Sequence, residues 1–322
     1  MELNLFCPFY DENQWALSPQ NTVNNVNNLG AVARTNVYTL DGNGGLLGVH
    51  AALVRKLVTE LKDFDNVYYE ICNEPYFGGV TMAWQHHIAD VIAETEKNFR
   101  HQHLISQNIA NGKAQITDPH PAVSIFNFHY ASPPNTVAMN LGLQKVIGDN
   151  ETGFKGTNDT HYRMEAWEFI LAGGALYNNL DYSFTVGHEG GTFVYPKTQP
   201  GGGNPAFRTQ MKVLKDFIHS FDFIRMQPIM EPAFDGRPGP DGVRMRGLEE
   251  SGNQYAFYLF AGRPVKSSPL EISIPAGTYR TEWVNTFTGE IEKRESVAHG
   301  GGVIKFISPR YEQDIALRVR RR

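Results

Sequence analysis

Apolar and polar residues alternate in two different ways along this chain, and up to about residue 227 they form a repeating pattern. Short runs rich in β-branched and aromatic residues predict six strands, which are separated by loops or by stretches of helical periodicity. The predicted strands are Glu2–Tyr10, Asn66–Pro75, His103–Asn108, Ala122–Tyr130, Leu143–Asn150 and Ala175–Phe184, with a short extended piece at Thr35–Leu40. The predicted helices are Leu46–Phe64, Met82–Phe99, Tyr162–Leu171 and Phe207–Phe223.

This alternation of strands and helices predicts a parallel sheet, because parallel neighbours need a crossover connection. A (β/α) barrel is the natural closed form, and such a barrel has eight strands. We therefore predict the α/β class, with a TIM-type (β/α) barrel that lacks its first two strands in this chain. We expect those two strands to precede Met1 in an N-terminally incomplete protein. The alternative is that other structure replaces them.

Beyond about residue 228 the sequence pattern changes to short runs of alternating apolar and polar residues, which are separated by Gly- and Pro-containing turns. This pattern predicts a C-terminal antiparallel β-sandwich, so the expected domains are 1–227 and 228–322. The predicted strands there are Val243–Arg246, Tyr255–Phe260, Leu270–Ile274, Tyr279–Val284, Val303–Phe306 and Ile315–Val319, and four prolines at 228, 232, 238 and 240 mark the junction.

Composition narrows the class of partner. The 322 residues carry a net charge of -5, which argues against a nucleic-acid ligand. No run of about twenty apolar residues predicts a membrane span, and the first residues lack the regions of a signal peptide. Localisation stays open, with export of a longer form as one option, and the oligomeric state also stays open. Cys7 and Cys72 lie in apolar runs, which favours buried thiols over a disulfide or a metal site. The 31 glycines and 12% aromatic residues suit a carbohydrate site with many loops.

Two glutamates follow apolar strands and are candidates for chemistry. Glu74 lies in the Asn-Glu-Pro that ends the second predicted strand, and Glu151 directly follows the fifth. Carboxyl ends of parallel strands gather at one mouth of a barrel, so both side chains are expected there. Glycosidic bond cleavage needs such a pair, with one carboxyl group protonating the departing oxygen and the other attacking the anomeric carbon or activating water. Either glutamate alone is equally compatible with a structural ion pair.

The segment Glu70–Pro75 resembles the Asn-Glu-Pro signature at the end of the fourth strand in clan A glycoside hydrolases, the cellulase-like retaining enzymes on (β/α)8 barrels. The resemblance covers roughly residues 1 to 225. It implies that Glu74 is the acid/base, that Asn73 hydrogen-bonds the sugar 2-hydroxyl, and that Glu151 is the nucleophile. An arginine that the family usually has near the end of its second strand would precede this chain.

The segment Phe128–Tyr130 resembles the sixth-strand segment in which these enzymes place an imidazole or an aromatic hydroxyl near the nucleophile. It implies roles for His129 and Tyr130. Further side chains near strand ends are of the types that stack on sugars or bind hydroxyl groups, although ordinary packing is an equally good account of each. They are Tyr10, Trp15, Tyr76, Phe77, Tyr182 and His188, together with Asn108 and Asp181. Strand alternation also turns Glu70 inward, where a carboxylate needs a partner.

Other motifs are weaker. The histidines at 86, 87, 101 and 103 lack Cys or carboxylate neighbours at ligand spacing, so we expect no metal and no cofactor. Gly42–Gly45 lacks the Lys-Ser/Thr of a phosphate loop, and no Gly-x-Ser-x-Gly is present. The segment Pro275–Asn285 is similar to a small domain, named for collagen binding, that trails glycosidase barrels. The alternative for this sandwich is a purely stabilising role.

The resulting hypothesis is a retaining glycoside hydrolase that acts on a β-linked oligo- or polysaccharide, with neither nucleic acid nor membrane as a partner. Retention requires carboxyl groups about 5 to 5.5 Å apart, whereas inversion needs about 6.5 to 9.5 Å. The rival hypothesis is a non-catalytic carbohydrate-binding or adhesion protein on a degenerate barrel. The sequence does not distinguish the sugar, the linkage, or internal from terminal cleavage.

Overall fold

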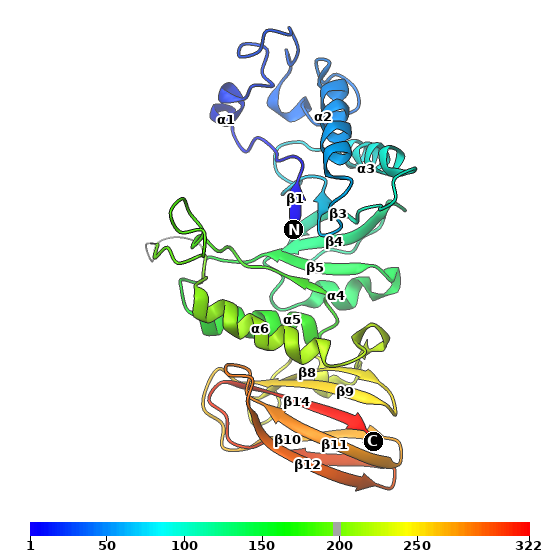
Figure 1. Ribbon diagram of the computed structural model, residues 1–322, viewed down its shortest axis with the longest axis vertical. Coiled ribbons are helices and arrows are strands. Elements are labelled where there is room, and N and C mark those ends of the chain that lie inside the picture. The colour runs from blue at the N-terminus through cyan, green and yellow to red at the C-terminus, as the bar shows by residue number, and fades with distance from the viewer. Residues whose placement is uncertain (196–200) are drawn as a thin grey trace. The chain divides into compact units, whose positions relative to one another are not determined.

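A computed structural model describes residues 1–195 and 201–322 (Figure 1). The chain divides into two compact units: Met1–His129 with Met139–Gly148, and Tyr130–Ala138 with Asp149–Arg322. A six-stranded sheet has the order β1-β2-β3-β4-β5-β6, and its β1/β2, β2/β3 and β3/β4 pairs are parallel. The strands are β1 (Glu2–Asn4), β2 (Tyr68–Glu70), β3 (Ile105–Asn111), β4 (Val123–His129), β5 (Val146–Glu151) and β6 (Leu176–Tyr177). The expected mixed α/β fold with a parallel, barrel-like sheet is confirmed at this level, as a half-barrel.

Three strands are much shorter than predicted. Glu2–Tyr10 shrinks to β1, Asn66–Pro75 to β2, and Ala175–Phe184 to β6. The remaining residues of these runs have strand-like composition, but their backbones lie in loops; Pro8, for example, has no N–H to give to a ladder. The extended piece predicted at Thr35–Leu40 is wrong, since a 3-10 helix and turns occupy it. Val37 and Tyr38 look like strand residues in the sequence, but they are apolar side chains that a loop buries.

Three helices of the first unit are α1 (Glu12–Leu17), α2 (Leu46–Leu61) and α3 (Met82–Glu96). Helix α2 buries Ala51, Val54 and Val58, one stripe at helical spacing, and it packs against α3. Thr81 caps α3 by accepting a hydrogen bond from the backbone N–H of Trp84. Helix α1 was not predicted, because it has only six residues.

In the second unit, α5 (Asp159–Leu171) and α6 (Pro205–His219) cover one face of an antiparallel sheet. The Asn204 side chain accepts a hydrogen bond from the backbone N–H of Phe207, and Pro205 occupies the first turn of α6. Strand β9 (Gln254–Phe260) is buried at all seven positions because both its faces are covered. Tyr258 packs towards the helices, whereas Phe257 packs into the core of the sandwich.

The C-terminal strands form a six-stranded sheet, β12-β11-β14-β9-β8-β7, and a two-stranded sheet, β10-β13. Apolar side chains of both sheets share one buried core, including Ile272, Trp283 and Phe306. The strands are β7 (Gln227–Pro228), β8 (Arg244–Glu250), β10 (Pro269–Ile274), β11 (Gly277–Val284), β12 (Ile291–His299), β13 (Gly302–Ile307) and β14 (Asp314–Arg321). The predicted antiparallel β architecture is confirmed, and the boundary at residue 228 stays a prediction. Strand β12 was missed because its residues are polar and mostly exposed.

The remaining short helices are α4 (Asn135–Asn140) and the 3-10 helices Arg34–Asn36, Leu141–Leu143, Phe223–Arg225 and Pro232–Phe234. None of the helices in the described ranges combines the length and the apolar composition needed to cross a bilayer. Both cysteines are free thiols. Cys72 is buried as predicted, but Cys7 is exposed, in the loop that follows β1.

Candidate functional site

Glu74 lies in the loop that follows β2, four residues beyond the end of the strand. Its backbone φ is +42°, in the left-handed region that costs a non-glycine residue about 1 kcal/mol or more. Backbone hydrogen bonds fix this turn: the N–H of Asn73 donates to Phe6 O at 2.9 Å, and the N–H of Phe77 donates to Glu74 O at 3.0 Å. Such over-determined strain is typical of functional sites.

Three side chains meet the Glu74 carboxyl group. The Tyr10 hydroxyl donates to Oε2 at 2.6 Å, and the Tyr76 hydroxyl lies 3.5 Å from Oε1. The Nδ1 atom of buried His129, the last residue of β4, also lies 3.5 Å from Oε1. Burial and the hydrogen bond to Glu74 raise the pKa of Tyr10, so this phenol stays a neutral donor. Asn73 Nδ2 donates to the Tyr10 hydroxyl at 3.3 Å. The structure therefore brings five predicted site residues together in the first unit.

Beneath this group the sheet interior of the first unit is polar. Glu70 is fully buried, and its Oε2 accepts hydrogen bonds from Ser106 Oγ at 3.1 Å and from Asn127 Nδ2 at 2.7 Å. The expectation that Glu70 turns inward is confirmed, and these two bonds offset part of its desolvation cost. Barrel interiors usually carry Val, Ile and Leu in such layers. A buried carboxylate with hydroxyl and amide neighbours is therefore a specific feature of this chain.

Asn108 is another buried polar residue of this region. It is 1% exposed, and among the described residues neither its amide oxygen nor its amide nitrogen has a hydrogen-bond partner. Buried amides usually have partners, so this side chain is suited to binding a ligand or water. Trp15, by contrast, is buried against the ring of Phe9 with centroids 5.0 Å apart. That contact fits packing, and the predicted sugar contacts of Asn108 and Trp15 stay predictions.

Glu151 ends β5 in the second unit, and Tyr130 holds it. The Tyr130 hydroxyl donates to Glu151 Oε1 at 2.5 Å, and the Tyr130 backbone N–H donates to Glu151 O at 2.8 Å. Tyr130 has φ +54° and Phe154 has φ +61°, and their rings lie 5.9 Å apart. A charge-assisted phenol hydrogen bond of this length orients the carboxylate.

Asp149 lies two residues before Glu151 and is 1% exposed. Burial, followed by the charge of Glu165, raises its pKa well above the usual range, although backbone hydrogen bonds from Ala131 and Tyr130 oppose the rise. Asp149 thus supports the turn that carries Tyr130. The sequence analysis missed this residue, and the signal available was an acidic residue directly after the apolar pair Val146-Ile147 and Gly148.

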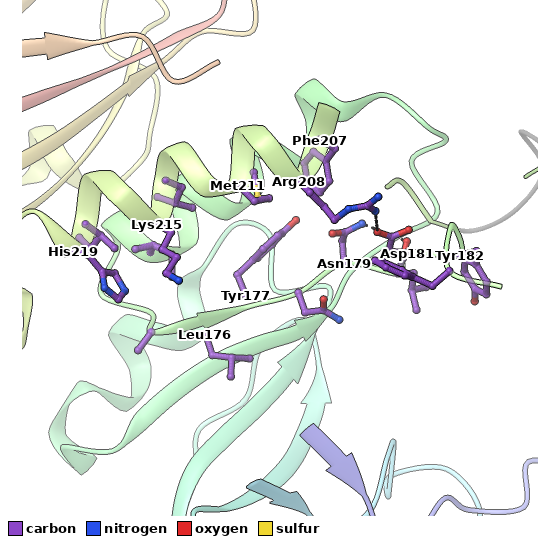
Figure 2. A pocket seen from close by; sticks show the side chains of 17 residues that line it. Leu176, Tyr177, Asn179, Asp181, Tyr182, Phe207, Arg208, Met211, Lys215 and His219 are labelled. Atoms are coloured by element: carbon purple, nitrogen blue, oxygen red, sulfur yellow. Dashed lines mark hydrogen bonds and ion pairs between the residues drawn. The ribbon is translucent and has the colours of Figure 1, made fainter. Parts of the chain in front are cut away.

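Tyr182 lies elsewhere in the second unit, at a cavity of about 890 Å³ between the β6 segment and α6 (Figure 2). It is 41% exposed. Arg208 extends from α6 and donates to Asp181 Oδ2 at 2.8 Å and to Ser183 Oγ at 2.9 Å. Glu151 is not among the described residues that line this cavity, so Tyr182 and Asp181 form a separate group.

Comparison with known proteins gives the fold. No family model and no curated protein sequence matches the chain. The structure is similar to a glycoside hydrolase with a TM-score of 0.64, 19% identity, and coverage of 85% of this chain and 69% of the other. It is also similar to a family 5 glycoside hydrolase from Bacteroides vulgatus, with a TM-score of 0.60, 17% identity, and coverage of 84% and 66%. For an endo-β1,6-glucanase the TM-score is 0.50 at 13% identity, with coverage of 87% and 64%. The fold is that of glycoside hydrolases, and the chain spans about two thirds of the length of these structures.

Proposed function

We propose that this protein hydrolyses β-linked glycans with retention of configuration, using Glu74 as acid/base and Glu151 as nucleophile. One observation carries the proposal: His129 faces Glu74, and Tyr130, the next residue in the chain, holds Glu151. Each glutamate thus has a hydrogen-bonding group from the same dipeptide. The glycoside hydrolase fold supports the same conclusion.

In the first step, the Glu151 carboxylate attacks the anomeric carbon while the proton of Glu74 passes to the departing glycosidic oxygen. The carbon–oxygen bond to the leaving group breaks as the ester bond to Glu151 forms. In the second step, the Glu74 carboxylate takes a proton from water, and the oxygen of that water displaces Glu151. Both carboxyl groups then return to their starting states.

The neighbouring residues divide into supports for each role. Tyr10 donates to Oε2 of Glu74 at 2.6 Å, whereas Tyr76 and His129 lie at 3.5 Å from Oε1, so the more weakly held Oε1 is the oxygen that we assign to proton transfer. Asn73 lies in the same turn, directly before Glu74, and its side-chain amide would bind a sugar hydroxyl group. The exposed rings of Tyr76 and Phe77, with centroids 4.9 Å apart, offer a surface on which a sugar can stack.

The test is hydrolysis of aryl β-glycosides with leaving groups of graded acidity, followed by a panel of β-glucans, mannans, and plant and host glycans. Glu151→Gln should abolish turnover on every substrate with the fold intact. Glu74→Gln should retain more activity when the leaving group is an acidic phenol, because that group departs without a proton. Glu60→Gln is the matched control, since Glu60 is exposed and pairs with Lys56 at the surface.

Proton NMR of the first product anomer separates retention from inversion. Full activity of the Glu151→Gln variant would refute the assignment, and an inverted product would refute the double displacement. Glycan binding with no turnover on the whole panel favours the rival, a carbohydrate-binding protein without catalysis.

A further inference from the structure

One face of strands β11, β12 and β14 carries a cluster of arginines that the proposed active site does not use. We define the arginine array as Arg280, Arg294, Arg318 and Arg320 around Glu282. These side chains line a surface cavity of about 580 Å³, together with Ile291, Arg321 and Arg322. The array belongs entirely to the second unit.

Strand register explains why these side chains share a face. Glu282 lies opposite Arg294 of β12 and opposite Arg318 of β14, and Arg280 lies opposite Arg320. Residues at alternate positions of a strand point to the same side of its sheet. The intervening Trp283 is buried in the sandwich core, so the array lies on the opposite face of this sheet, the face that also bears α5 and α6. Arg318 accordingly donates to Ser220 Oγ, at the end of α6, at 2.8 Å.

Glu282 neutralises only part of this positive charge. Its Oε1 accepts from Arg280 at 2.5 Å and from Arg294 at 2.8 Å, and its Oε2 accepts from Arg318 at 2.6 Å. Burial alone would raise the pKa of Glu282, but hydrogen bonds and charges from Arg318 and its neighbours lower it below the usual value. Glu282 is therefore ionised at neutral pH, and four guanidinium groups share one carboxylate.

Arg320 is the member of the array with least compensation. Its Nη2 atom is buried and, within the described part of the chain, has no hydrogen-bond partner. Its guanidinium lies over the ring of Phe221, 5.0 Å from the centroid. Burial and the adjacent charge of Arg318 lower the pKa of Arg320. A buried N–H without an acceptor is costly, and a bound anion would relieve both this cost and the repulsion among the arginines.

We propose that the arginine array binds an anionic polysaccharide through its uronate carboxylates or sulfate esters. Arg280 and Arg294 are about half exposed, so a ligand can reach them. Guanidinium groups bind planar and tetrahedral oxyanions through paired N–H donors. Strands β12 and β14, which carry Arg294 and Arg320, lie two strand spacings apart, roughly 10 Å, so the array is wider than one small ion and suits a polymer with repeated charges. The choice of a polysaccharide rests on the proposed function, and the net charge of -5 disfavours a nucleic acid.

The test uses the whole chain in affinity electrophoresis through gels that contain polygalacturonate, dextran sulfate or uncharged dextran. The double variant Arg280→Gln/Arg320→Gln leaves Glu282 paired with Arg294 and Arg318. The control, Arg237→Gln/Arg310→Gln, removes the same charge from two highly exposed arginines outside the array. We expect about tenfold weaker retention of the array variant by acidic gels and little change in the control.

Retention by only one of the two acidic polymers supports the proposal and identifies the anionic group. Equal weakening in the two double variants overturns the proposal, as does equally tight binding of duplex DNA in a competition assay. The Glu151→Gln variant should bind like the parent chain. Binding that depends on the array, without hydrolysis of any glycan, supports the array proposal and contradicts the catalytic one. Hydrolysis without array-dependent binding supports the catalytic proposal and contradicts the array proposal.

Discussion

Tyr130 contacts Glu151 twice, through its hydroxyl at 2.5 Å from Oε1 and through its backbone N–H at 2.8 Å from the carbonyl oxygen. The backbone hydrogen bond fixes the main chain of Tyr130 against that of Glu151. The Tyr130 hydroxyl therefore needs little further ordering to reach the Glu151 carboxylate during the reaction. Tyr130 has φ +54°, a strained value for a large side chain. Its surroundings must compensate for that strain.

The first prediction concerns this hydroxyl. Tyr130→Phe should lower kcat about tenfold to a hundredfold, because a hydrogen bond to a charged group contributes roughly 1.5 to 3 kcal/mol. Steady-state kinetics on an aryl β-glycoside measures the loss. Tyr68→Phe is the matched control, since it removes a 2.5 Å hydrogen bond from the phenol of Tyr68 on β2 to the carboxylate of Glu2 on β1. Equal losses in both variants would show that stability, and not chemistry, is affected.

The positions of the two glutamates of the candidate site could be predicted because the local sequence marks the ends of their strands. The Asn-Glu-Pro after β2 and the Glu at the end of β5 follow from strand composition and from the proline, and both glutamates lie at those places. The Tyr10 to Glu74 hydrogen bond joins residues 64 positions apart, so its partner could be proposed only as a ring near a strand end. Asp149 was missed because a single acidic residue in a strand carries no sign of its neighbours.

The same physical limit applies to the fold. The apolar run of β9 predicted a strand correctly, but burial on both faces depends on α5 and α6, which contact Tyr258 from one side. Strand β12 has charged residues on both faces, so neither alternation nor β-propensity marked it. Its pairing with β11 along nearly its whole length, a tertiary interaction, defines it.

The second prediction concerns pH and His50 in α2. Trp84 Nε1 donates to His50 Nδ1 at 3.3 Å, while His50 Nε2 lies 2.7 Å from Gln20 Oε1, so the neutral ring fits this site. Burial lowers the pKa of His50 from 6.5 to about 4. Above pH 6.5 both folded and unfolded chains hold a neutral ring. As the pH falls from 6.5 towards 4, only the unfolded chain gains the proton, and stability is lost by about 1.4 kcal/mol per pH unit.

Urea unfolding at pH 7 and pH 5 measures this effect. The parent chain should lose about 2 kcal/mol more between these two pH values than His50→Gln, which cannot titrate. His101→Gln, a change at an exposed histidine, should follow the parent chain. An identical pH dependence of the parent and His50→Gln would contradict the assignment of a neutral buried imidazole.

The third prediction concerns the ion pair between α5 and β14. Arg163 donates to both carboxylate oxygens of Asp314, at 3.2 and 2.8 Å, and the two side chains are 3% and 2% exposed. Tyr258 also donates to Asp314 Oδ2 at 2.9 Å. Asp314→Asn should therefore lower the free energy of unfolding by about 3 to 5 kcal/mol, because it leaves the Arg163 charge buried without a counter-charge. Glu312→Gln breaks an exposed pair with Arg310 and should change stability by less than about 1 kcal/mol. Urea unfolding of both variants decides the matter. If Asp314→Asn costs no more than the surface variant, water must reach Arg163, and the helix is not held to the sheet by this pair.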